Sequence, residues 1–333
     1  MVRGAALVVG SAICYGMGPI IFKSGLAAGL APFDLLMCRF CLAAILLTAF
    51  LLIRGRGRIA IPRRTMLRAV VAAPVFNCSQ TFLFVTALKY IPASTNSLIL
   101  YVYPLAVAVL SRLFFGFQAG REFVISLLLV LAGSVFVSFD AFFQAAPLPG
   151  IAASVGAMLV FSANLIVLQR FLRTEDPMAF TLCVFVVAGV IFAAVRGPTA
   201  VLSYTPEQAM WATLAGVVPT ALAVPLLYAG VARIGSAYAS IFSSLELVVT
   251  VALSGLVLGE AVSWRQAAGM GCIIGGLVLP NLALLRTYRA VHGREAPKRR
   301  HPTIWGQTGR DDVKNGFGAR FAVRVRSRSR KAS

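Results

Sequence analysis

Charged side chains are scarce in this sequence, and acidic ones are the scarcest. Only 13% of the 333 residues are charged and 11 are Asp or Glu, whereas soluble domains carry roughly 25% charged residues. The hydrophobic share is 59% and the mean hydropathy is +0.85. This composition excludes an ordinary soluble protein, whose core does not need so much apolar surface, and it predicts an integral membrane protein.

Residues that commonly carry enzyme chemistry are also few. The two histidines, His292 and His301, lie near the C-terminus, and the sequence has no glycine-rich phosphate loop and no metal-ligand spacing. The six cysteines fall in apolar stretches; Cys38 and Cys41 match a C-x-x-C pattern, but lipid would disfavour the thiolate that such a pair needs. We therefore expect no catalytic residue, no cofactor, no metal, no disulfide framework and no use of ATP by this chain.

Long apolar runs, by contrast, are abundant. A membrane-spanning helix needs about 20 mostly apolar residues, and about ten stretches meet that criterion. The first run is too long for the core of a signal peptide, so we expect it to be retained as a helix. The stretches cover residues 4–23, 32–53, 68–88, 94–115, 121–140, 150–171, 178–195, 211–231, 237–258 and 264–285. The prediction is an all-α integral membrane protein with ten transmembrane helices.

Basic residues are unevenly distributed among the links between these stretches, and this predicts their orientation. The link after the second stretch holds six arginines between positions 54 and 68, which places it on the cytoplasmic side. Every second link from there carries further arginines. The alternate links carry only Lys23, Lys89, Arg196 and Arg265. Both termini are then cytoplasmic, in a bacterial-type inner (plasma) membrane.

The two halves of the chain resemble each other. An offset of 143 residues aligns LSRLFFG at 110–116 with LSGLVLG at 253–259 without a gap. Further aligned pairs are Ile91 with Ile234 and Ser97 with Ser240 at the same offset, and Gly4 with Gly150 and Tyr15 with Phe161 at an offset of 146. Apolar helices look alike by composition, but the ungapped match and equal helix counts favour a duplication. A copy of five helices inverts the next copy in the membrane, as in many secondary transporters.

We accordingly divide the chain into a first five-helix repeat at 4–140, a second at 150–285, and a tail at 286–333. The chain has a net charge of +20, and the tail is rich in arginine and poor in apolar residues. We predict a disordered, basic, cytoplasmic tail held near anionic lipid. Nucleic acid is the disfavoured alternative, because no folded nucleic-acid-binding module accompanies the charge.

Several motifs resemble those of a known family. They are the run LELVVTVALSGLVLGEAVSWRQAAGMGCIIGGLVL in the second half and, in the first, Cys38-Arg39-Phe40, ALKYIPAS at 87–94 and Tyr103-Pro104. Over residues 4–285 the chain is similar to the drug/metabolite transporter superfamily, specifically the EamA-type carriers with ten spans. Leu247 departs from the family, which often has Pro there, and Phe117 stands where a Glu is often repeated. The resemblance implies a carrier of small solutes but does not name the cargo.

Glu246 is the most unusual residue of the apolar runs. It lies about nine residues into its stretch, near the middle of the bilayer. A charge there costs at least about 2.5–3.5 kcal/mol, so the side chain should face the bundle interior or a wet cavity. The offset of 143 pairs it with Tyr103 at a similar depth in the first half. A proton or substrate site is the functional interpretation, and a neutral Glu that bonds neighbouring helices is the alternative.

Four other residues are candidates for the same site. Arg39 lies roughly two turns into its stretch and could pair with a carboxylate or hold an anionic substrate group. Snorkelling to the interface, or pairing within the scaffold of the resembled family, is an equal alternative. Asn77 and Gln80 are three residues apart, so on a helix they share a face that could line a cavity; each alone could equally bond a neighbouring helix. Tyr15 could line a pocket or simply pack in the core.

Proline and glycine add expectations about helix shape and packing. The prolines within the stretches are expected to bend them: Pro19, Pro74, Pro104, Pro219 and Pro225. The G-x-x-x-G patterns at 255–259 and 271–275 favour close helix packing, either within the bundle or between the subunits of a homodimer.

The function expected from these features is secondary transport of small organic solutes by alternating access. Export of a metabolite or amino-acid-like compound, driven by proton entry, is the first choice. Two alternatives stay open. One is a facilitator that equilibrates its solute without ion coupling, and the other is a membrane scaffold that transports nothing and recruits partners through its basic tail.

Overall fold

The computed structural model describes residues 2–54, 61–91, 93–139, 147–197, 203–258 and 261–292, and every regular element in these segments is a helix. Residues up to Arg289 form one compact unit. Gly259, Glu260 and residues 293–333 of the predicted tail lie outside the described residues. The last helix continues to His292, so residues 286–292 of the predicted tail are helical.

Each apolar stretch found in the sequence is mainly helical over its described residues. Those of the first half form α1 (Val2–Gly16), α2 (Gly18–Ala27), α3 (Pro32–Ile53), α4 (Arg63–Ala72), the π-helix η1 (Ala73–Cys78), α5 (Ser79–Leu88), α6 (Ala93–Leu100), α7 (Tyr103–Phe115) and α8 (Arg121–Val137). Those of the second half form α9 (Leu148–Phe171), α10 (Pro177–Arg196), α11 (Pro206–Gly216), the π-helix η4 (Val217–Leu222), α12 (Ala223–Ser243), α13 (Leu245–Leu258) and α14 (Trp264–His292).

Within the described residues, seven helical stretches are long and apolar enough to cross a membrane. The longest, Pro206–Val257, has 52 residues, which at 1.5 Å per residue is roughly 78 Å, more than twice the bilayer core of about 30 Å. Gly235 interrupts it with φ +78° and ψ 164°, a conformation that is essentially restricted to glycine. The chain can therefore turn there and cross twice. The count of ten crossings stays a prediction.

Local sequence signals explain where several helices begin and end. Asp176 caps α10 by accepting hydrogen bonds from the backbone N–H groups of Met178 and Ala179, at 2.9 and 3.0 Å. Thr205 and Gln208 form a reciprocal capping box at the start of α11. Gly116 ends α7 in the left-handed conformation, with φ +64°.

Three of the apolar stretches are broken near their middle. The first is interrupted at Met17, between α1 and α2; the fourth at Tyr101 and Val102, between α6 and α7; and the ninth at Ser244, between α12 and α13. Pro19 and Pro104 follow two of the breaks, within the first two positions of α2 and α7. Proline has no backbone N–H and so cannot donate a hydrogen bond to the preceding turn of a helix. When a helix starts anew just before a proline, one fewer backbone N–H group is left without a partner at its first turn.

The third and eighth stretches contain π-helices instead of breaks. Pro74 lies in η1 and Pro219 in η4. A π-turn pairs residues five apart, accommodates an extra residue, and is frequent at functional sites. Because the two π-helices occupy corresponding stretches of the two halves, the irregularity itself is repeated.

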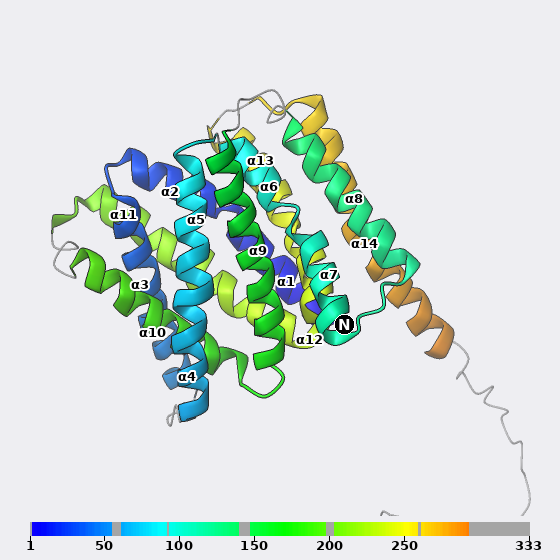
Figure 1. Cartoon of the computed structure of the whole chain (residues 1–333), viewed down its shortest axis with the longest axis horizontal. Helices are drawn as coiled ribbons and strands as arrows, with labels where there is room; N and C mark the ends of the chain where they lie inside the picture. The colour runs from blue at the N-terminus through cyan, green and yellow to red at the C-terminus, as the bar shows by residue number, and fades with distance from the viewer. Residues whose placement is uncertain are drawn as a thin grey trace, which may run out of the picture. The chain divides into compact units, whose positions relative to one another are not determined.

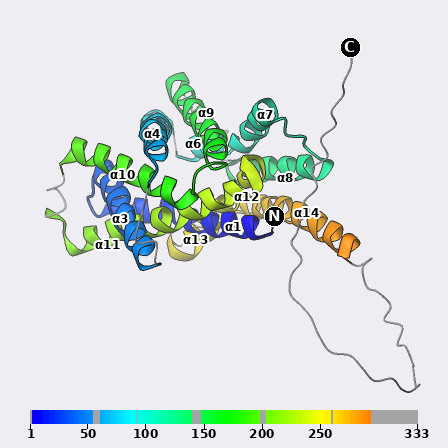
Figure 2. The same ribbon diagram turned by 90° about the horizontal axis from the view of Figure 1, so that it is seen from below.

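The helices pack so that segments from the two halves alternate. α9 of the second half lies between α5 and α7 of the first, and α1 of the first half packs against α12 and α13 of the second (Figure 1). Seen from below, α4, α9 and α7 line one side, and α11, α1 and α13 the other (Figure 2). α3 packs against α10, where the Phe40 and Phe192 rings stack with centroids 5.7 Å apart.

Close backbone contacts between the halves come in matched pairs. A Cβ added to Gly4 would lie 2.5 Å from Cγ2 of Ile234, and one added to Gly150 would lie 2.6 Å from Cγ2 of Ile91. Gly4 and Gly150, like Ile91 and Ile234, are pairs that the sequence aligns. The contact of Gly4 with Ile234 is therefore equivalent to the contact of Gly150 with Ile91, with the roles of the first and second halves exchanged.

α8 and α14 form a second matched contact. A Cβ on Gly269 would lie 2.6 Å from the carbonyl oxygen of Gly133, and a Cβ on Gly276 would lie 2.9 Å from that of Ser126. The higher-numbered residue of α8, Gly133, contacts the lower-numbered residue of α14, Gly269, so the two helices are antiparallel. The G-x-x-x-G pattern at 271–275 makes no such contact within the described bundle: apart from the nearby backbone of α14 itself, no atom of the described residues lies within 4 Å of a Cβ built on Gly271 or Gly275.

Candidate functional site

The two residues that the sequence pairs at mid-depth both lie at helix breaks. Tyr103 is the first residue of α7, and Glu246 is the second residue of α13. Each therefore lies at the N-terminus of a half-helix, where unpaired N–H groups and the helix dipole favour negative charge. In transporters, such discontinuous helices near the membrane midplane commonly form the substrate site.

Glu246 points toward other polar groups of the bundle. Its carboxyl lies close enough to the hydroxyl groups of Tyr15, Tyr101 and Tyr103 to interact with each electrostatically. The side chain is half-buried and makes no hydrogen bond or ion pair with any described residue. Its backbone carbonyl accepts a hydrogen bond of 2.9 Å from the Thr250 hydroxyl, which also donates to the Gly16 carbonyl at the break of the first stretch.

Arg39 is held by the π-helix of the second half. Its Nε donates a hydrogen bond of 3.0 Å to the Thr220 hydroxyl in η4, and its guanidinium carbon lies 5.3 and 4.9 Å from the ring centroids of Phe22 and Phe40. Among the described residues no carboxylate pairs with Arg39. The two terminal nitrogens, which suit bidentate binding of a carboxylate, thus have no hydrogen-bond or ion-pair partner in the described part of the chain.

Tyr15 connects the two charged residues. It is half-buried near the end of α1 and interacts electrostatically with both Arg39 and Glu246. It also interacts with Tyr228 of α12, whose hydroxyl lies beside the Asn77 amide in η1. The structure thereby brings Tyr15, Arg39, Asn77 and Glu246 into one chain of polar neighbours, contributed by both halves.

Asn77 carries an unusual unsatisfied group. Its Nδ2 atom is buried beside the Tyr228 hydroxyl, but it makes no hydrogen bond of acceptable geometry with any described residue. A buried donor without a partner is costly and rare in native structures, and a water or a ligand commonly supplies the missing acceptor. Gln80, expected on the same face, lies in α5 beyond the π-helix, and no hydrogen bond between described residues joins it to the cluster. The wider π-turn at 73–78 changes the spacing that the expectation assumed.

Tyr103 has a more structural environment than the other candidates. It is only 3% exposed, its hydroxyl donates a 3.1 Å hydrogen bond to the Ser240 carbonyl, and its ring meets Phe161 edge-to-face at 5.0 Å. By the alignment of the halves, Tyr103 and Phe161 correspond to Glu246 and Tyr15. The contact between the Tyr103 and Phe161 rings thus occupies the position that corresponds to Glu246 beside Tyr15.

Comparison with known proteins identifies the chain. The model of the EamA-like transporter family matches it twice, at residues 2–139 and 148–282. The chain belongs to the EamA-like transporter family. It is an integral membrane transporter of small solutes and not an enzyme, as the sequence motifs implied.

Individual relatives of this EamA-like transporter agree with the family match. An uncharacterized transporter, YetK, from Bacillus subtilis (strain 168) is 24% identical over 287 residues, which are 82% of each chain. A solved crystal structure superposes with a TM-score of 0.69 at 20% identity, and the match covers 84% of this chain and 98% of the other. The second likeness concerns the fold alone.

Three members of the EamA-like transporter's polar cluster were not among the site residues predicted from the sequence, although Tyr101 and Tyr228 are evident there as polar residues within the spans. Thr220 joins the site through Arg39, and Tyr101 and Tyr228 join it through Glu246 and Asn77. The available signal was Pro219, which marks the π-helix beside Thr220. Other buried polar groups bond neighbouring helices: the Ser154 hydroxyl donates a 2.6 Å hydrogen bond to Oδ1 of Asn96, and both side chains are fully buried.

Proposed function

We propose that this protein is an alternating-access carrier that exports a small zwitterionic, amino-acid-like solute from the cell. Arg39 would bind the carboxylate of the solute, and Glu246 would bind its ammonium group or exchange a proton in its place. The observation that carries the proposal is that a basic and an acidic side chain, Arg39 and Glu246, flank Tyr15 without ion-pair partners among the described residues.

Energetics supports this choice of cargo. An unpaired charge within the membrane costs at least about 2.5–3.5 kcal/mol, so two of them are retained in a fold only where they have a use. A zwitterion offers each of them a partner, and the orphaned Nδ2 of Asn77 offers one more donor to an acceptor on the solute. A purely apolar cargo would leave all three groups unsatisfied.

The proposed architecture is a pair of five-helix repeats, at 4–140 and 150–285, inverted in the membrane and crossing it ten times. The matched Gly4–Ile234 and Gly150–Ile91 contacts support it, as does the antiparallel pairing of α8 with α14. Rocking of one repeat against the other about the broken helices would expose the site to each side in turn.

The distribution of basic residues supports cytoplasmic termini in an inner membrane. Gly4 lies against Arg233, Gln169 accepts a hydrogen bond of 2.8 Å from the backbone N–H of Ser236, and Arg68 donates one of 2.9 Å to Thr174. These contacts gather several of the links predicted as cytoplasmic at one end of the bundle. Association of the tail with anionic lipid and assembly into a homodimer remain predictions from the sequence.

Solute efflux from proteoliposomes tests the proposed function. Vesicles loaded with a mixture of zwitterionic amino acids, simple carboxylates and simple amines should lose the zwitterions faster when the protein is present, as measured by mass spectrometry. Acidifying the outside should speed this loss if protons enter in exchange. An efflux rate that does not depend on the pH gradient would instead identify an uncoupled facilitator. Loss of only the carboxylates or only the amines from the vesicles would contradict the proposal that the solute is zwitterionic.

The same vesicles separate a carrier from a scaffold. A chain that ends after His292 removes the basic segment but keeps the whole of α14. The carrier predicts an unchanged efflux rate for this chain. A protein whose function depends on recruiting partners through its tail would show no efflux in either form.

A further inference from the structure

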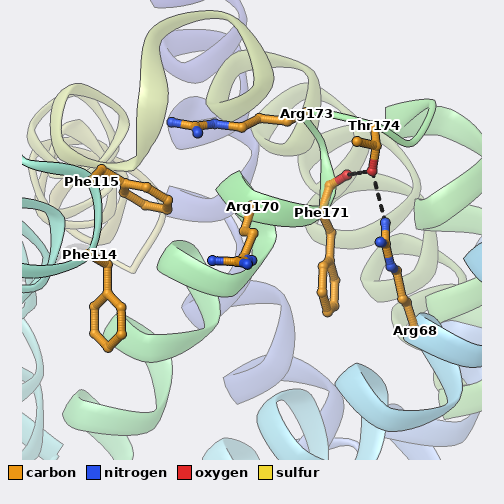
Figure 3. A pocket seen from close by; sticks show the side chains of 7 residues that line it. All are labelled: Arg68, Phe114, Phe115, Arg170, Phe171, Arg173 and Thr174. Carbon is orange, nitrogen blue, oxygen red and sulfur yellow. Dashed lines mark hydrogen bonds between the residues drawn. The ribbon is translucent and has the colours of Figure 1, made fainter.

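A basic, aromatic hollow lies away from the polar cluster, where helices of both halves end. It has a volume of about 400 Å³ and is lined by Arg68 of α4, Phe114 and Phe115 of α7, Arg170 and Phe171 of α9, and Arg173 and Thr174 just after α9. That volume is within the range of about 300–1,000 Å³ typical of small-molecule sites. Figure 3 shows Arg170 at the centre, between Phe114 and Phe115 on one side and Phe171 and Arg68 on the other.

The hollow carries excess positive charge. Arg68 is already neutralised, because it forms an ion pair of 2.5 Å with Glu175 and a hydrogen bond of 2.9 Å with the Thr174 hydroxyl. Arg173 stacks over the ring of Phe115 at 4.9 Å, which fixes its position without offsetting its charge. Neither Arg170 nor Arg173 forms an ion pair with a described residue. Two guanidinium groups are therefore free to bind a phosphate.

The apolar wall of the hollow continues along the outside of the bundle. Leu105, Val109 and Leu113 follow one another at intervals of four on α7 and are 42, 51 and 72% exposed, and Phe114 beside them is 66% exposed. α4 and η1 carry a matching exposed row, Leu67, Val71 and Val75. Exposed apolar rows of this kind on a membrane protein are suited to contact with acyl chains. The hollow thus combines a basic site that suits the charged headgroup of a lipid with two exposed apolar rows, on α7 and on α4 and η1, that suit its acyl chains.

We propose that this hollow binds the phosphate headgroup of an anionic phospholipid from the leaflet at the arginine-rich end of the bundle. Arg170 and Arg173 hold the phosphate, and Phe114 and the α7 row contact an acyl chain. The lipid then joins α4 and α7 of the first half to α9 of the second. The inference depends on the membrane location of the chain and not on the identity of its transported solute.

Lipid titration of the full-length protein in a neutral detergent tests this site. Phosphatidylglycerol, phosphatidylcholine and inorganic phosphate are added separately, and binding is followed by native mass spectrometry and by the shift in melting temperature. The Arg170→Gln/Arg173→Gln variant is compared with Arg63→Gln/Arg64→Gln, which removes the same charge from exposed residues at the start of α4, outside the hollow. Melting without lipid checks the fold of both variants.

Phosphatidylglycerol should bind the wild type and the Arg63→Gln/Arg64→Gln control equally. Its affinity for the Arg170→Gln/Arg173→Gln variant should fall about 25-fold, because each arginine near an anionic headgroup contributes roughly fivefold. Phe114→Ala should weaken lipid binding as well. An equal loss of lipid affinity in the two double variants would show only a diffuse attraction between the lipid and basic residues, and would overturn the site. Unchanged lipid binding to the Arg170→Gln/Arg173→Gln variant would overturn it as well. If inorganic phosphate raised the melting temperature of the protein as much as the lipid does, the ligand of the hollow would be a soluble anion and not a lipid.

Discussion

Glu246→Gln is expected to lower solute efflux roughly tenfold to a hundredfold while leaving the amount of folded protein unchanged. A hydrogen bond to a charged group contributes about 1.5–3 kcal/mol, and the amide can neither hold an ammonium group with full charge nor exchange a proton. The half-buried side chain makes no hydrogen bond or ion pair with a described residue, so its replacement should not disturb the packing. Efflux from proteoliposomes and size-exclusion chromatography measure the two quantities.

Glu207 provides a matched control for this change. It also lies in the first turn of a helix, α11, but it is exposed and away from the breaks. Glu207→Gln should therefore transport at the wild-type rate, and Glu246→Asp should retain part of the activity because it keeps the charge. An active Glu246→Gln variant, or a loss of flux that merely follows a loss of folded protein, would contradict the role of this carboxylate.

Gly269→Ala is expected to destabilise the protein, and Gly271→Ala, two residues along the same helix, is not. A Cβ at Gly269 would lie 2.6 Å from the Gly133 carbonyl oxygen and 2.9 Å from the backbone nitrogen of Val137, so α8 and α14 would have to separate. Overpacking of this kind costs about 1–3 kcal/mol. At Gly271 no atom of the other described helices lies within 4 Å of the added Cβ, and alanine is favoured over glycine in a helix by about 1 kcal/mol.

Thermal unfolding in detergent distinguishes the two variants. The melting temperature should fall for Gly269→Ala and stay the same or rise for Gly271→Ala. Gly276→Ala should behave like Gly269→Ala, because it meets the Ser126 carbonyl at 2.9 Å in the matched contact. Equal melting temperatures for all three would mean that α8 and α14 do not pack as described, and would weaken the case for inverted repeats.

Hydropathy located the helices well because it reports which segments prefer lipid to water. The predicted stretch at 32–53 coincides with α3, and those at 150–171 and 178–195 differ from α9 and α10 by one or two residues at most. The alignment of the halves paired residues that make equivalent contacts, since Gly4 contacts Ile234 as its aligned partner Gly150 contacts Ile91. These features depend on composition and local pattern, which a single sequence displays.

The interior geometry of the spans was less visible in the sequence. Tyr101 and Val102 are apolar enough to continue a spanning helix, so nothing in their hydropathy reveals the break between α6 and α7. Proline gave a partial signal: Pro104 follows that break and Pro219 lies in η4, but Pro225 lies within α12 beyond the π-helix. The partnership of Arg39 with Thr220 spans 181 residues and could not be read from spacing.

The existence of a water-accessible chamber at Glu246 can be measured by thiol labelling. In a chain whose native cysteines are replaced by alanine, Glu246→Cys and Leu105→Cys place one thiol each close to a helix break; Leu105 is exposed on the outer row of α7. With a membrane-impermeant thiol reagent, Glu246→Cys should react in both inside-out and right-side-out vesicles, because the proposed chamber would open to each side in turn. Leu105→Cys should react in neither, because it faces lipid. Failure of Glu246→Cys to react from either side, or equal labelling of Leu105→Cys, would contradict a polar chamber between the two halves.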